Sequence, residues 1–147
     1  MTTKCSERHI SIDEEIAVSK AIFEAKVLAE EAGFEETQQF MVSTAVAELA
    51  MNIFSHALKG EVTLRTIERG STKGIEVIAE DNGPGIQDIA SAMMDHFTTG
   101  KGLGLGLPGA KRLMDEFIIH SEPGKGTKIT ARKWVSDMQT SIHKEQI

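Results

Sequence analysis

The chain has 147 residues, a length that favours a single domain with its own hydrophobic core. Its formal net charge of −6 argues against nucleic acid as the main partner, and its one cysteine excludes an internal disulfide and a cysteine-rich zinc site. We find no signal peptide and no apolar run long enough to span a bilayer, so we expect a cytoplasmic protein without membrane contact.

The first third of the chain predicts a short strand and two helices. Polar and apolar residues alternate over residues 8–12, as in an edge strand. Asp13 is a candidate N-cap of a helix that Gly33 would end. Thr37 is a candidate N-cap of a second helix, which would run to about Leu58 and be closed by Gly60.

Three polar residues follow one another at four-residue steps on this second helix: Glu48, Asn52 and His56. The spacing places them one turn apart on a line that borders the apolar stripe of the helix. A carboxylate and an amide at the edge of a core suggest a functional site, although a solvated rim would give the same pattern.

A hairpin of two strands is predicted next, over residues 61–68 and 74–80, around a loop with glycine at both ends. The second strand runs directly into Asp81-Asn82-Gly83-Pro84-Gly85. Ligand-binding groups gather at such strand ends in α/β layers. Asp81 also suits a plain turn, so both interpretations stay open at this point.

The remainder predicts two helices and two strands. The helices cover Ile86 to Met94 and Leu105 to about Glu116, and the strands cover residues 117–120 and 127–134. A turn at residues 122–126 joins the two strands.

A glycine run lies between these two helices, with glycine at positions 100, 102, 104, 106 and 109. Glycine lets backbone N–H groups approach a ligand, and a helix N-terminus behind such a loop favours polyphosphate binding. The dinucleotide fingerprint G-x-G-x-x-G fits residues 104–109, but the strand that should precede it directly is missing. A Walker A loop is excluded because glycine follows Lys101, and a flexible linker remains the alternative.

Four motifs in this order resemble the boxes of the Bergerat (GHKL) ATP-binding fold over about residues 35–134. They are Glu48-x-x-x-Asn52, Asp81-x-Gly83-x-Gly85, Gly102-x-Gly104-x-Gly106 and Gly124-Lys-Gly-Thr127. We therefore expect an α/β two-layer sandwich, in which helices cover one face of a mixed β-sheet. One domain would occupy residues 1–147, with a core over about residues 8–134 and a polar tail over residues 135–147.

Within that superfamily the chain resembles the small bacterial serine/threonine kinases related to anti-sigma factors, especially the switch kinases of the stressosome. The resemblance implies ATP and Mg²⁺ as cofactors and phosphoryl transfer to STAS-domain scaffold and antagonist proteins. It further implies that the released kinase activates a PP2C-type phosphatase in a stress-signalling pathway. Two alternatives stay open: an anti-sigma factor kinase that sequesters a sigma factor, and a docking module with residual nucleotide affinity. A NAD-binding domain is a more remote one.

The same resemblance assigns roles to individual residues. Glu48 is the candidate general base and Asn52 the candidate Mg²⁺ ligand. Asp81 would accept a hydrogen bond from the adenine amine, and Thr127 would support adenine through a water. Lys101, where this subfamily leads us to expect glycine, or Arg112 would steady the transferred phosphoryl group. The other expected nucleotide contacts are Gly83, Gly85, Ile86, Thr99, Gly100, Gly102, Leu103, Gly104, Leu105 and Gly106.

Overall fold

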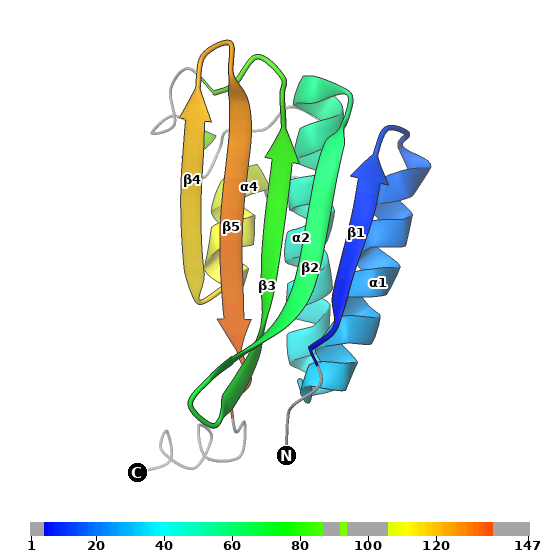
Figure 1. Cartoon of the computed structure of the whole chain (residues 1–147), viewed down its shortest axis with the longest axis vertical. Coiled ribbons are helices and arrows are strands. Elements are labelled where there is room, and N and C mark those ends of the chain that lie inside the picture. Colours follow the sequence, from blue (N-terminus) through cyan, green and yellow to red (C-terminus); the bar gives the residue numbers. More distant parts are fainter. Residues whose placement is uncertain (1–4, 87–91, 94–105, 137–147) are drawn as a thin grey trace.

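Figure 1 shows the computed structural model of the chain, which describes residues 5–86, 92–93 and 106–136. The elements follow one another as β1 (Glu7–Ile12), α1 (Ile16–Ala32), α2 (Glu36–Ala57), β2 (Gly60–Arg69), β3 (Thr72–Asp81), α4 (Gly106–Leu113), β4 (Glu116–Glu122) and β5 (Gly126–Trp134). No helix among the described residues combines the length and the apolar character needed to cross a bilayer.

The strands form one five-stranded sheet in the order β1-β2-β3-β5-β4. In the described part of the chain, each of the four strand pairings is antiparallel. Because no described pair of strands is parallel, the sheet is antiparallel and not mixed as predicted. β5 turns back from β4 and lies between β3 and β4, so β3 and β4, which run in the same direction, are not hydrogen-bonded neighbours (Figure 1).

The helices α1, α2 and α4 lie together on one face of the sheet, behind the strands in Figure 1. Alternate strand residues such as Val62, Val77 and Ile129 point to that face and are buried against the helices. Apolar residues of α1 and α2, including Leu28 and Leu49, complete the core. The predicted two-layer α/β sandwich with helices on one face is therefore confirmed.

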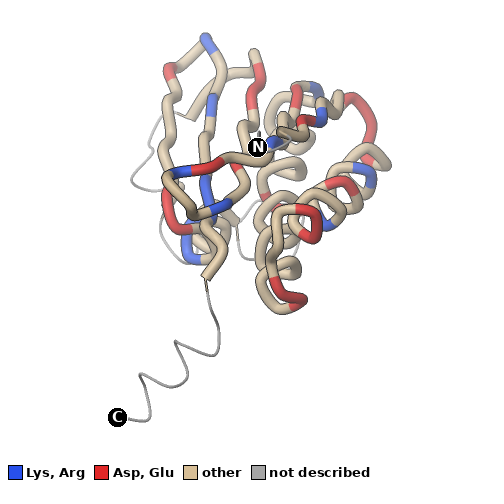
Figure 2. Tube along the Cα trace, turned by 60° about the horizontal axis from the view of Figure 1, so that its bottom comes forward, with Lys and Arg blue, Asp and Glu red and all other residues tan. Residues whose placement is uncertain are grey.

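The other face of the sheet is open and carries charges of both signs (Figure 2). One charged residue on the open face is nevertheless buried. Glu76, 2% exposed, accepts hydrogen bonds from the Nε atoms of Arg65 and Arg132 at 2.6 and 2.7 Å. These two arginines, one on each neighbouring strand, balance the negative charge of Glu76, and a carboxylate paired in this way can be buried.

The predicted helix starts need correction, whereas one predicted end is confirmed. The N-cap residues are Glu15 and Glu35 rather than Asp13 and Thr37, and neither makes a side-chain cap hydrogen bond. Gly33 ends α1 as predicted, with φ of 100°. The loop that follows is so short that α2 begins before Thr37, and the position of the first turn overrides the preference for a Thr cap.

Two further boundaries differ from the sequence prediction. Leu58, with φ of 68°, caps the C-terminus of α2, and Gly60 already belongs to β2. The last helix ends at Leu113 instead of about Glu116, because Glu116 pairs with Arg132 as the first residue of β4. Most of the helix expected over residues 86–94 lies outside the described residues.

Candidate functional site

Three polar residues form a row across the end of the sheet. Asp81 at the end of β3 lies opposite Thr127 of β5, which in turn lies opposite Ser121 of β4. Asp81 is in phase along β3 with the buried residue Ala79, so the row belongs to the face that the helices cover. The sheet thus brings together the predicted adenine residues Asp81 and Thr127, and adds Ser121.

The Asp81 carboxylate is half-buried and shapes the loop that follows it. Its Oδ1 accepts a hydrogen bond of 2.9 Å from the N–H of Gly83. Asp81 is therefore a turn-forming residue, one of the two interpretations that the sequence left open. The second interpretation stays compatible, since a carboxylate has two oxygens and accepts several hydrogen bonds at once.

The loop of residues 81–86 is docked against its surroundings at several points. Gly85, with φ of 78°, leaves no room for a Cβ because the carbonyl oxygen of Glu122 lies against it. The N–H of Gly124 donates to the carbonyl of Pro84 at 2.7 Å. A Cβ on Gly83 would come within 2.5 Å of the Cβ of Ala57 on α2. The glycines of this motif are thus required by close packing.

Glu48 and Asn52 lie on α2, which packs on the same side of the sheet as the polar row. Glu48 is 5% exposed, and its Oε2 accepts a hydrogen bond of 3.1 Å from the N–H of Gly106, the first residue of α4. Asn52 is half-buried and His56 is exposed. The polar line predicted on this helix is therefore buried at Glu48, half-buried at Asn52 and exposed at His56.

Seven of the predicted nucleotide contacts lie outside the described residues: Thr99, Gly100, Lys101, Gly102, Leu103, Gly104 and Leu105. Gly106 is described, with φ of 61°, and opens α4. Arg112 is exposed on α4. The phosphate-binding roles of these residues stay predictions.

The described residues could hold Mg²⁺ only together with the phosphates of a bound nucleotide. Among the described residues, no group of three or more His, Cys, Asp or Glu side chains forms a metal site. Mg²⁺ usually keeps several waters and is held by one or two protein oxygens together with substrate phosphates. The amide oxygen of Asn52 fits that pattern.

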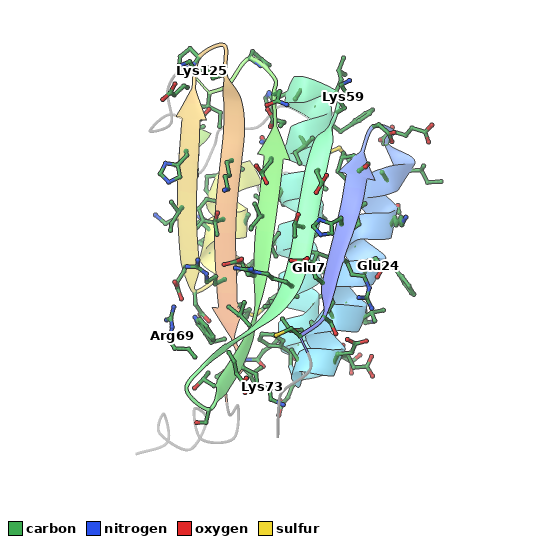
Figure 3. All side chains as sticks on the ribbon, viewed as in Figure 1. Glu7, Glu24, Lys59, Arg69, Lys73 and Lys125 are labelled. Carbon is green, nitrogen blue, oxygen red and sulfur yellow. The ribbon has the colours of Figure 1, made fainter. Side chains whose placement is uncertain are left out.

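A cavity of about 720 Å³ opens at the same end of the sheet, and its wall includes Asp81 and Thr127. Neither Glu48 nor Asn52 lines it, and Glu80 and Lys128 in its wall come from the open face of the sheet. We therefore assign the candidate site to the helix side of the polar row and not to this cavity. Figure 3 shows Lys59 and Lys125 at this end of the molecule.

Two residues of the site were missed by the sequence analysis. Ser121 falls between the strand predicted over residues 117–120 and the turn predicted at residues 122–126, and its pairing with Thr127 brings it into the row. Gly60 was read as a helix terminator, but it lies opposite Asp81, where a Cβ would come within 2.7 Å of Cγ2 of Ile53. The hairpin register counted back from the turn at residues 122–126 would have indicated Ser121.

The family described as histidine kinase-like ATPase domain matches residues 10–133. The serine/threonine-protein kinase RsbT of Bacillus subtilis is 49% identical over 108 residues, which cover 74% of this chain and 81% of RsbT. An anti-sigma F factor of Thermoanaerobacter sp. is 36% identical over 100 residues, covering 64% of this chain and 68% of that protein. The structure of the mycobacterial sensor histidine kinase MprB covers 90% of this chain and is itself covered completely, with a TM-score of 0.52 and 17% identity, a similarity of fold.

Proposed function

The chain belongs to the histidine kinase-like ATPase domain family, and we propose that it is an ATP-dependent serine/threonine protein kinase. One observation carries the proposal. α2 presents a buried carboxylate, Glu48, and an amide, Asn52, one turn apart on the side of the sheet where Asp81 and Thr127 form the polar row. The proposal is further supported by the 49% identity to RsbT, which is named a serine/threonine-protein kinase.

In this proposal the polar row binds the base of ATP. The Asp81 carboxylate accepts a hydrogen bond from the exocyclic amine of adenine, while its bond to Gly83 keeps the side chain oriented. The close packing of Gly83 and Gly85 holds the loop in place before the nucleotide arrives. A site arranged in this way loses little conformational entropy on binding.

Glu48 has two roles in this proposal, as the general base and as the acceptor of a hydrogen bond from Gly106. As the general base it takes the proton of the attacking Ser or Thr hydroxyl. In the structure its Oε2 is bound to the N–H of Gly106, so it also anchors the start of α4 and the end of the glycine run. Mg²⁺, when bound through Asn52, supplies charge neutralisation at the phosphates.

We propose STAS-domain scaffold or antagonist proteins as phosphoryl acceptors in the cytoplasm, and a PP2C-type phosphatase as the second partner of the released kinase. These partners come from the resemblance to the stressosome switch kinases. A second candidate function is an anti-sigma factor kinase, which the 36% identity to an anti-sigma F factor supports. Capture of a sigma factor by the purified chain would favour this second candidate.

The test is transfer of labelled γ-phosphate from ATP, with Mg²⁺, to a STAS-domain protein from the same genome. Glu48→Gln keeps an oxygen that accepts the N–H of Gly106 but cannot take a proton. We expect it to bind ATP and to lose roughly 10²–10⁴-fold in transfer rate, the range for a general base. Glu48→Ala removes the anchor as well, and we expect it to weaken ATP binding too.

The outcomes separate base from anchor. If Glu48→Gln transfers phosphate at the wild-type rate while Glu48→Ala does not, Glu48 acts as an anchor and the base assignment is wrong. If the wild-type chain binds ATP tightly but transfers no phosphate to STAS-domain proteins, the chain is a docking module, and the phosphatase becomes the partner to test.

A further inference from the structure

We infer that Ser121 is a positioning residue that makes the base site select a 6-amino purine, because it fixes the direction of the Thr127 hydroxyl. The inference rests on the proposed function, in which Asp81 and Thr127 face the base of ATP. Ser121 is half-buried on β4, directly opposite Thr127. It received no role in the sequence analysis.

The Ser121 hydroxyl contacts three polar groups. Its Oγ accepts a hydrogen bond of 2.7 Å from the N–H of Ile86. It lies 3.1 Å from the carbonyl oxygen of Gly126 and 2.8 Å from Oγ1 of Thr127. Ser121 therefore joins the loop after β3 to both residues that begin β5.

The direction of each bond follows from donor and acceptor counting. A hydroxyl has one hydrogen to donate and two lone pairs that accept. The carbonyl of Gly126 only accepts, so it takes the Ser121 hydrogen, and the N–H of Ile86 occupies one lone pair. The second lone pair is left for Thr127, so Thr127 is the donor in the Ser121–Thr127 bond.

This arrangement leaves Thr127 as an acceptor towards a ligand. Its single hydrogen points to Ser121, its side chain is buried at 6% exposure, and its lone pairs are what remains. The ionised carboxylate of Asp81, opposite Thr127 in the sheet, also only accepts. A row of acceptors suits the amine of adenine, whose N–H groups donate, and disfavours the oxygen at the same position of a 6-oxo purine.

Without Ser121 this polarity would be lost. The Thr127 hydroxyl would be free to rotate and to donate directly to the O6 atom of a 6-oxo purine. Loss of the Ile86 bond would also loosen the loop, but that effect weakens binding of every purine nucleotide alike. The ratio of the two affinities therefore isolates the positioning role.

The test measures the Kd of ATP and of inosine triphosphate by calorimetry with Mg²⁺. We expect the wild-type chain to prefer ATP and Ser121→Ala to lower that preference about tenfold, the size of one hydrogen bond. Ser121→Thr keeps the hydroxyl and should restore the preference. Thr66→Ala is the matched control, since Thr66 also accepts a backbone N–H, from Ser6 at 2.9 Å, at the other end of β2.

An unchanged ratio in Ser121→Ala, with or without equal weakening of both nucleotides, would overturn the inference. If Ser121→Ala does not fold, Ser121→Cys replaces it, because a thiol is a weak donor and a weak acceptor and must show the same loss of preference. A wild-type chain that binds neither nucleotide would overturn the proposed function and this inference together, so the two failures are distinguishable.

Discussion

At the scale of single residues, the clearest electrostatic effect lies far from the candidate site. Glu116 on the open face of the sheet accepts a hydrogen bond of 2.6 Å from Nε1 of Trp134, and also binds Arg132 and Arg69 at 3.1 and 3.3 Å. These partners, the Trp134 hydrogen bond first, lower the pKa of the Glu116 carboxyl below its usual 4.5. The guanidinium of Arg69 stacks over the Trp134 ring, 4.4 Å from its centroid.

The lowered pKa of Glu116 predicts an acid transition that the single tryptophan reports. A lowered folded-state pKa means that the stabilising contribution is present above about pH 4.5 and is lost as pH falls through the folded-state value. We expect the fluorescence of Trp134 to change in a transition centred below pH 4.5, and Glu116→Gln to remove it. A midpoint at or above 4.5 would contradict the assignment.

At the scale of elements, the contact between the loop of residues 81–86 and the β4–β5 turn fixes the geometry of the base site. Gly85 and Gly70 both have positive φ, of 78° and 63°, but their surroundings differ. A Cβ on Gly85 would collide with the carbonyl of Glu122, whereas a Cβ on Gly70 would meet no atom within 4 Å. Alanine substitutions at Gly70 and Gly85 therefore distinguish the cost of backbone strain from the cost of a steric collision.

We predict that Gly85→Ala weakens ATP binding at least tenfold and lowers stability, because the loop must leave the turn to make room. Gly70→Ala, in the hairpin between β2 and β3, should cost only the strain of a left-handed backbone, about 1–2 kcal/mol, and leave ATP binding unchanged. Thermal unfolding and calorimetric titration of both variants provide the comparison. Equal effects on ATP binding would show that the loop is not held by this contact.

At the scale of the whole molecule, the open face of the sheet is held by a charge network across four strands. It consists of Arg65 and Arg69 on β2, Glu76 on β3, Arg132 and Trp134 on β5, and Glu116 on β4. The hydrogen bond to Glu76 raises the pKa of Arg132, as expected for a guanidinium held between two carboxylates. The network links these strands on the face that none of the described helices covers.

Removal of the central carboxylate should therefore destabilise the fold without affecting the site. Glu76→Ala leaves Arg65 and Arg132 without their buried partner, and we expect a loss of about 2–4 kcal/mol in the free energy of unfolding. Glu80→Ala, an exposed residue of the same strand and face, should change it by less than about 0.5 kcal/mol. Denaturant unfolding of the two variants measures both values. Similar losses would mean that the network does not stabilise the fold more than an exposed residue does.

The sequence by itself determined the local features of this protein. Period-two alternation identified β1, a loop with glycine at both ends identified the hairpin of β2 and β3, and Gly33 identified the end of α1. Four glycine- and acid-containing motifs in order identified the family. These signals are local, because they depend on the spacing of residues within one element or one loop.

Only the tertiary structure decided which elements are neighbours. β5 lies between β3 and β4, which makes the pairings antiparallel and places Thr127 between Asp81 and Ser121. The bond from Gly106 to Glu48 likewise joins residues 58 positions apart. Strand order and register depend on burial and hydrogen bonding between distant segments, and periodicity within a segment carries no information about its partner. The position of Asp81 beside Thr127 and Ser121, and with it the polar row, therefore had to come from the fold.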